Sequence, residues 1–270
     1  MYMGADPESP NYDKKHRIIR SPYNGGRGPL FRARYDDVHY NLVHHHVNLS
    51  PLYEPPENWF EDEAERQKVH QLFDEIVMQG DVPVNLSAAA LGADAYLYTG
   101  EDRYRNWVAE YVGAWIERAR LNDSQIPDNV GLSGAVGEYL DGKWYGGCYG
   151  WGFTVTVPQT GAKANRNIVP RAVIGFGNAL LVTGEQQYID VWRHMLATIN
   201  ANAKEVDGQT LYPSMYGDEG WYAYGPTPYS AGALQTYLWS MDPNDRALAD
   251  NDWIRYPVSY THLRAHETSL

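Results

Sequence analysis

Two stretches of the chain decide the expected fold: Tyr98-Thr99-Gly100-Glu101-Asp102-Arg103-Tyr104 and Val182-Thr183-Gly184-Glu185-Gln186-Gln187-Tyr188, which align at an offset of 84 residues. In both, a Thr-Gly-Glu step separates an apolar stretch from one that opens with a tyrosine. Glycine is the usual residue just past a helix end, so each stretch predicts two helices joined by a tight turn.

Apolar residues at helical spacing surround both turns. The spacing predicts helices over residues 63–79, 85–99, 104–116, 170–183, 188–199 and 229–241. A helical hairpin cannot bury its apolar face alone, so the repetition predicts hairpins stacked around a shared core. The expected fold class is therefore all-α, with paired helices arranged as an arc or a closed ring.

The repeated unit is a small-residue helix, Thr-Gly-Glu, two further residues, a tyrosine and an aromatic-rich helix. It resembles the hairpin of (α/α) toroid carbohydrate-active enzymes, which include six-hairpin glycosidases and toroidal polysaccharide lyases. The resemblance covers about residues 60–240 and concerns architecture alone. It implies an (α/α) toroid or incomplete toroid, with long Gly/aromatic loop insertions, that acts on a saccharide.

The ends of the chain set the expected domain. We expect one toroid-like domain over residues 1–257, a fragment of a longer protein. Residues 258–270 resemble the translated read-through of a sequencing adapter, and we expect them to be a non-native tail. The compartment stays open, since an extracytoplasmic location fits if the true N-terminus is missing.

Composition and charge exclude several classes of protein. The 22 Lys+Arg against 34 Asp+Glu give a net charge of −12, which argues against a nucleic-acid partner. No apolar run is long enough for a membrane helix, and one cysteine excludes both a disulfide framework and a cysteine-based zinc site. Residues 13–34 and 141–171 nevertheless carry net charges of +6 and +3, so local positive potential can offset repulsion of an acidic ligand.

Two insertions concentrate the aromatic residues and many of the glycines. The first covers residues 122–167 with its centre at 141–153, and the second covers residues 211–224. Glycine lets the backbone approach a ligand, and Tyr and Trp combine an apolar face with a polar tip. The insertions therefore predict a substrate cleft, with a packed plug in the ring or a solvated turn as the alternatives. The residues expected to bind substrate are Trp144, Trp151, Asn129, Lys143, Trp221 and Tyr222.

Two chemistries compete for a saccharide substrate. Elimination from a uronate needs a Tyr or His to move a proton and an Arg or Asn to neutralise the carboxylate, and the candidates are Tyr145, Tyr149, His44, His46, Arg166 and Asn129. Hydrolysis needs two carboxyl groups, for which Asp128 and Asp218 are candidates beside Glu138, Asp141 and Glu219. The lyase is slightly favoured, because the first insertion offers tyrosines and cations more freely than a carboxylate pair.

The histidines near the N-terminus do not predict a metal site. His44 and His46 share a face of an extended segment, but no carboxylate follows at a familiar ligand spacing, so we expect no metal and no cofactor. A non-catalytic saccharide-binding protein and a helical scaffold for protein partners remain alternatives to an enzyme. The expected partner is a saccharide, with no nucleic acid and no membrane, and the oligomeric state stays open.

Overall fold

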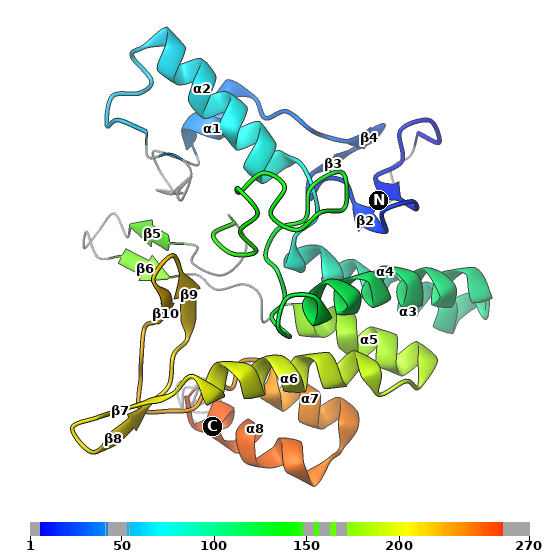
Figure 1. Ribbon diagram of the computed structural model, residues 1–270. Coiled ribbons are helices and arrows are strands. Elements are labelled where there is room, and N and C mark those ends of the chain that lie inside the picture. The colour runs from blue at the N-terminus through cyan, green and yellow to red at the C-terminus, as the bar shows by residue number, and fades with distance from the viewer. Residues whose placement is uncertain are drawn as a thin grey trace, which may run out of the picture.

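Three helical hairpins form the body of the protein (Figure 1). The computed structural model describes residues 6–40, 42, 53, 55–147, 154–156, 163–165 and 172–255. The hairpins pair α3 (Ala88–Thr99) with α4 (Asp102–Arg120), α5 (Val173–Thr183) with α6 (Gln187–Ala201), and α7 (Ala233–Ser240) with α8 (Pro243–Arg255). The predicted helices at these places are confirmed, although the last predicted helix begins later because Gly232, with φ 75°, precedes Ala233.

The repeated Thr-Gly turn has the same geometry in both copies. Gly100 and Gly184 end their helices in the left-handed region, at φ 69° and 76°. The Thr99 hydroxyl donates to the Ala95 carbonyl at 2.7 Å, and the Thr183 hydroxyl donates to the Ala179 carbonyl at 2.6 Å. These hydroxyls also accept from the next backbone N–H but one, at 3.2 Å in each copy. The predicted helical hairpins therefore form for the expected reason.

Helix α5 lies at the centre of the packing and contacts α3, α4, α6 and α7. Its glycines make this possible, because a Cβ at Gly177 would lie 2.2 Å from the Trp239 ring and one at Gly175 would lie 2.6 Å from the Leu86 carbonyl oxygen. The largest side chains of the core, all fully buried, are Trp115, Trp192, Tyr111 and Phe176.

The N-terminal part adds two short β-hairpins and a second hydrophobic cluster. Strand β1 (Tyr12–Asp13) pairs with β2 (Ile18–Ile19), and β3 (Asn24–Gly25) pairs with β4 (Gly28–Pro29). Helix α1 (Tyr35–His39) is followed by α2 (Glu63–Phe73), a π-helical turn (Asp74–Met78) and a 3₁₀ turn (Pro83–Ser87). The second cluster joins Val38, Trp59, Val69, Phe73, Val77 and Met78.

Three more antiparallel ribbons lie between and beyond the helices. They pair β5 (Thr154–Thr156) with β6 (Lys163–Asn165), β7 (Lys204–Val206) with β8 (Gln209–Leu211), and β9 (Met215–Gly217) with β10 (Gly220–Tyr222). The β7–β8 turn contains only Asp207 and Gly208, both at positive φ, which is the geometry that matches the twist of a two-residue hairpin.

The expectations of an all-α fold and of an (α/α) toroid were wrong. The described part of the chain combines helices with five two-stranded antiparallel sheets, so the fold is mixed α and β. Part of the physical reason lies in the second segment interpreted as a loop insertion, where the turn Gly217-Asp218-Glu219-Gly220 closes the β9–β10 ribbon. Val206-Asp207-Gly208-Gln209, just before that segment, carries the Asp-Gly signal of another hairpin.

Candidate functional site

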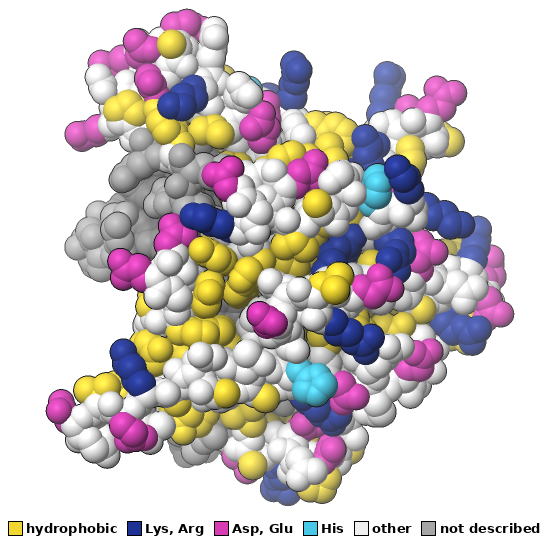
Figure 2. Space-filling view, in the orientation of Figure 1, with side chains coloured by type: hydrophobic (Ala, Val, Ile, Leu, Met, Phe, Trp, Pro, Cys, Tyr) yellow, Lys and Arg dark blue, Asp and Glu magenta, His cyan; other side chains and the backbone are white. Residues whose placement is uncertain are grey.

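The two predicted insertions meet in a cluster of aromatic side chains. We call Trp144, Tyr145, Tyr216 and Trp221 the aromatic cluster. The Tyr216 ring centre lies 4.9 Å from that of Trp144, 5.0 Å from that of Tyr145 and 5.0 Å from that of Trp221. Figure 2 shows hydrophobic side chains gathered on this face, beside the β9–β10 hairpin. All four are only partly buried, so flat apolar faces and polar tips remain at the surface.

A charged group borders the aromatic cluster. The Lys143 ammonium and the Tyr145 hydroxyl both donate to the same Oδ1 atom of Asp218, at 2.8 and 3.0 Å. These bonds, the one from Lys143 above all, hold the pKa of Asp218 below its usual value. Partial burial, together with the bond to Asp218, raises the pKa of Tyr145 to about 12. Tyr145 therefore keeps its proton at neutral pH, and its hydroxyl can donate a hydrogen bond.

A buried carboxylate positions the segment that carries Lys143 and Tyr145. Asp128 is fully buried and accepts from the Gly147 N–H at 3.0 and 3.1 Å and from the Asn129 amide at 2.8 Å. The Asn129 amide also donates to the Lys143 carbonyl at 3.0 Å, and the Asp128 N–H donates to the Trp144 carbonyl at 2.8 Å. A Cβ at Gly147 would lie 2.7 Å from Asp128 Oδ1, so only glycine fits beside the carboxylate.

The structure brings together some of the predicted site residues. Those in or beside the aromatic cluster are Asn129, Lys143, Trp144, Tyr145, Asp128, Asp218 and Trp221. Tyr222 lies on β10 opposite Met215, and its burial raises its pKa. The other predicted residues, His44, His46, Tyr149, Trp151 and Arg166, lie outside the described residues.

Sequence reasoning missed Tyr216, whose ring contacts three members of its own cluster. The signal was present in Gly217-Asp218-Glu219-Gly220, because a two-residue turn at Asp218 and Glu219 places Tyr216 opposite Trp221. The two acidic residues of this turn differ in their contacts, since Asp218 bonds to Lys143 of the first insertion and Glu219 has no hydrogen bond or ion pair in the described part of the chain.

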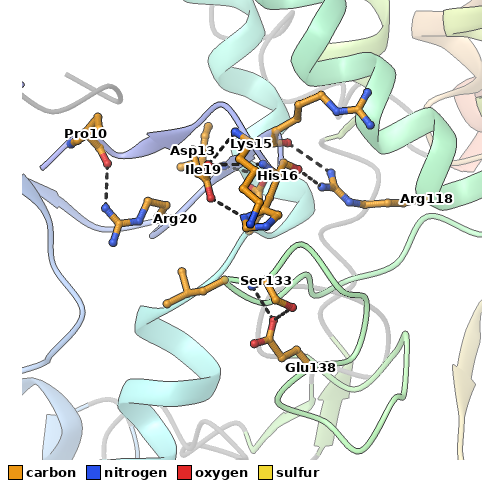
Figure 3. Close-up of polar contacts among 12 residues, drawn as sticks. Pro10, Asp13, Lys15, His16, Ile19, Arg20, Arg118, Ser133 and Glu138 are labelled. Atoms are coloured by element: carbon orange, nitrogen blue, oxygen red, sulfur yellow. Dashed lines mark hydrogen bonds and ion pairs between the residues drawn. The ribbon is translucent and has the colours of Figure 1, made fainter.

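The basic N-terminal stretch holds the first β-hairpin on α4. Arg17 forms a two-pronged ion pair with Glu117, at 3.0 and 2.5 Å. Figure 3 shows Arg118 of α4 donating to the His16 carbonyl, at 2.7 Å, and Arg20 donating to the Pro10 carbonyl, at 3.1 Å. These three arginines therefore serve the packing of the N-terminal segment, and Glu117 neutralises the charge of Arg17.

Glu138, another acidic candidate, forms hydrogen bonds within its own loop. Glu138 accepts from the backbone N–H and the hydroxyl of Ser133, at 2.9 and 2.7 Å, and so closes its own loop (Figure 3). In the part of the chain that the structure describes, no group of three or more His, Cys, Asp or Glu side chains is placed to hold a metal ion.

A cavity of about 810 Å³ lies along one face of α2, away from the aromatic cluster. Its wall includes Gln67, which donates to Glu63 at 2.9 Å, and Gln71, which donates to Glu75 at 2.9 Å. Such pairs at a spacing of four residues are typical of a solvated helix face. We therefore place the candidate site at the aromatic cluster.

Comparison with known proteins gives a family without an assigned activity. Among the described helices, none has the length and apolar character required to cross a membrane. No curated protein and no solved structure matches the chain. A family model described as a domain of unknown function, DUF8034, matches residues 1–212, which is most of the chain. The chain therefore belongs to the DUF8034 family.

Proposed function

We propose that the protein is a carbohydrate-active enzyme that binds a polysaccharide or oligosaccharide at the aromatic cluster and cleaves its glycosidic bonds. The observation that carries the proposal is the convergence of Trp144, Tyr145, Tyr216 and Trp221 from two distant segments, with a Lys–Asp pair at their edge. Aromatic faces suit the apolar C–H faces of sugar rings, and the charged edge suits their polar groups.

Elimination from a uronate is the reaction that this site supports best. In that reaction a base removes the C5 proton, the electrons form a C4–C5 double bond, and the C4–O bond breaks as the leaving oxygen takes up a proton. The proton for the leaving oxygen comes from the base that took the C5 proton or from solvent. Tyr145 suits binding of the uronate, because its phenol keeps its proton and can donate a hydrogen bond. His44, His46 and Tyr149 remain the proposed candidates for the base, and Arg166 for a group that neutralises the carboxylate.

Hydrolysis by Asp128 and Asp218 is less favoured by the same geometry. Asp128 is buried and accepts hydrogen bonds from the Gly147 N–H and the Asn129 amide. Asp218 accepts hydrogen bonds from Lys143 and Tyr145, so both carboxylates already have partners within the protein. A glycosidase needs one carboxyl group to protonate the leaving oxygen and a second to attack or to activate water. Asn129 likewise acts as a positioning residue, since its amide is bonded to Asp128 and to the Lys143 carbonyl.

The test is incubation of the purified protein with uronate polysaccharides, with absorbance of the new unsaturated ends as the readout. We expect turnover by the wild type and a loss of about 100-fold in kcat/KM for Tyr145→Phe, which keeps the ring and removes the hydroxyl that donates to the uronate. Tyr98→Phe is the matched control, because Tyr98 is 95% exposed on α3 and remote from the site, and we expect it to match the wild type.

Other outcomes of this experiment separate the alternatives. Reducing sugar released without the absorbance would identify a glycoside hydrolase and would overturn the elimination. Saccharide binding without cleavage would identify a non-catalytic binding protein. A protein that neither binds nor cleaves any saccharide would overturn the proposal as a whole.

A further inference from the structure

The hydrogen bonds that Asp218 accepts are arranged like those of a ligand carboxylate in a binding site. Lys143 and Tyr145 come from one segment, and both donate to the single oxygen Oδ1 of Asp218. An ammonium and a phenol that converge on one oxygen are the donor set that a carboxylate needs. The acceptor comes from a different element, 75 and 73 residues further along the chain.

The Tyr145 ring and the backbone of Lys143 are held in place without the help of Asp218. The Tyr145 ring packs against Trp144 and Tyr216, with ring centres 5.5 and 5.0 Å apart. The backbone at Lys143 and Trp144 accepts hydrogen bonds from the Asn129 amide and the Asp128 N–H. These contacts fix the Tyr145 ring and the backbone of Lys143, so the phenol keeps its place and the Lys143 side chain still starts beside it when the acceptor changes.

The acceptor is held far less firmly. Asp218 occupies a two-residue turn between β9 and β10, and its side chain is 57% exposed, against 31% for Lys143. Exposed ion pairs contribute little to stability, since water solvates both partners and long side chains lose entropy. A competing carboxylate can therefore take the place of Asp218 at small cost.

We propose that Lys143 and Tyr145 form a binding site for the carboxylate of an acidic saccharide, and that Asp218 occupies this site in the ligand-free protein. The inference rests on the proposed function and deepens it, because it names the charged group by which the substrate is selected. A neutral saccharide leaves the bonds to Asp218 in place and gains nothing from them. The carboxylate of an acidic saccharide takes the place of the Asp218 carboxylate on Lys143 and Tyr145. Asp218 therefore competes with the ligand, and only a carboxylate that reaches both donors displaces it.

The experiment compares one ligand in two forms, a uronic-acid oligosaccharide and the same oligosaccharide with its carboxyl groups reduced to alcohols. Affinities are measured by titration of the intrinsic tryptophan fluorescence. We expect Asp218→Asn to tighten binding of the acidic form about fivefold, since the competing charge is removed, and to leave the reduced form unchanged. Lys143→Met should weaken the acidic form about tenfold and spare the reduced form.

Glu219→Gln is the matched control. It removes the same charge from the same turn, but Glu219 is exposed and has no hydrogen bond or ion pair within the described part of the chain. We expect its affinity for both forms to stay within about 1.5-fold of the wild type, because water solvates the exposed Glu219 carboxylate and no bond joins it to Lys143 or Tyr145. The difference in affinity between Asp218→Asn and Glu219→Gln therefore reports the bonds from Lys143 and Tyr145, because both variants remove one negative charge.

Each outcome decides between the two proposals. If Asp218→Asn lowers the affinity for the acidic form, or changes this affinity no more than Glu219→Gln does, the proposed carboxylate site is wrong. The proposed function still stands in that case, provided that the protein binds either saccharide. If no variant binds either form, both proposals fail. Circular dichroism of the three variants, which change only surface side chains, verifies that each one is folded.

Discussion

At the scale of single residues, Asp81 is a fully buried acid whose carboxylate accepts hydrogen bonds from several elements. Its Oδ1 accepts from the Val82 N–H, the Asn85 amide and the Tyr111 hydroxyl, at 3.0, 2.9 and 3.1 Å, and its Oδ2 accepts from the Ile19 N–H at 3.1 Å. The side chain thereby joins strand β2, the 3₁₀ turn and helix α4. Its burial raises its pKa to about 6, although the bond from Asn85 and the charge of Arg118 act in the opposite direction.

This pKa predicts how stability varies with pH. The pKa of Asp81 is higher in the folded state than in the unfolded chain, where 3.8 is usual, so folding favours the protonated acid. The contribution is fully present below about pH 4 and is lost as pH rises through about 6. Relative to Asp81→Asn, the wild type should lose up to about 3 kcal/mol of unfolding free energy over this range, as measured by urea denaturation.

Asp94→Asn provides the control for this measurement. Asp94 is exposed on α3, so we expect its unfolding free energy to follow that of the wild type at every pH. Parallel curves for the wild type and Asp81→Asn would show that Asp81 does not titrate in this range.

Residue types alone predicted much of the candidate site, but they did not predict its contacts. Trp144, Tyr145, Lys143 and Trp221 were expected from the mixture of aromatic, basic and glycine residues. The bond between Lys143 and Asp218 joins residues 75 positions apart, and no local pattern specifies such a pair. Asp128 was predicted as a catalytic candidate; the structure adds that it is fully buried and accepts from the Gly147 N–H, which the spacing of the residues does not reveal.

At the scale of secondary-structure elements, the two Thr-Gly turns both need a glycine in the left-handed conformation. Both Gly100 and Gly184 adopt positive φ, and a Cβ at either position would meet no atom within 4 Å. We expect Gly100→Ala and Gly184→Ala each to lower the free energy of unfolding by about 1 kcal/mol, since only the left-handed backbone is penalised. Thermal and urea unfolding measure this cost, and the double variant should be additive within about 0.5 kcal/mol.

Gly113→Ala is the control for a change from glycine to alanine. Gly113 lies inside α4 and also has open space around its Cβ position. Alanine favours a helix interior over glycine, so this variant should gain about 0.5–1 kcal/mol. A loss of the same size in all three variants would contradict the assignment of the cost to backbone conformation.

The helices were predictable and the ribbons were missed for a physical reason. Helical periodicity is sustained over several turns, as in α4 and α6, and a glycine marks two of the helix ends. The described strands have at most three residues, too few for alternation to stand out. Their turns carried the signal instead, in Asp207-Gly208 and in Gly217-Asp218-Glu219-Gly220.

At the scale of the whole molecule, the described hydrophobic core is divided into two clusters. One cluster is formed mainly by helices α3 to α7, and the other joins α1, α2 and the π-helical turn. Parts of a protein with separate cores open with different free energies. We therefore expect the α1–α2 part to open before the helical hairpins do.

A matched pair of substitutions tests this division. Val69 of α2 and Val112 of α4 are both fully buried, one in each cluster. Val69→Ala should cost about 2 kcal/mol and speed hydrogen exchange in α2 while leaving exchange in α4 and α6 unchanged. Val112→Ala should speed exchange throughout. Equal acceleration in every helix by both variants would show that the molecule opens as one unit.

The position of the first insertion has a consequence for the history of the family. The insertion leaves the hairpins after Arg120 at the end of α4 and returns at Val173 of α5, and these two helices contact each other. The cost of closing such a segment grows only with the logarithm of its length. Ile126 and Val130 of the insertion belong to the core, but Asp141 and Gly142 are exposed. Extra residues at this exposed point therefore cost little free energy, so that the length of the insertion can change while the helical hairpins stay the same.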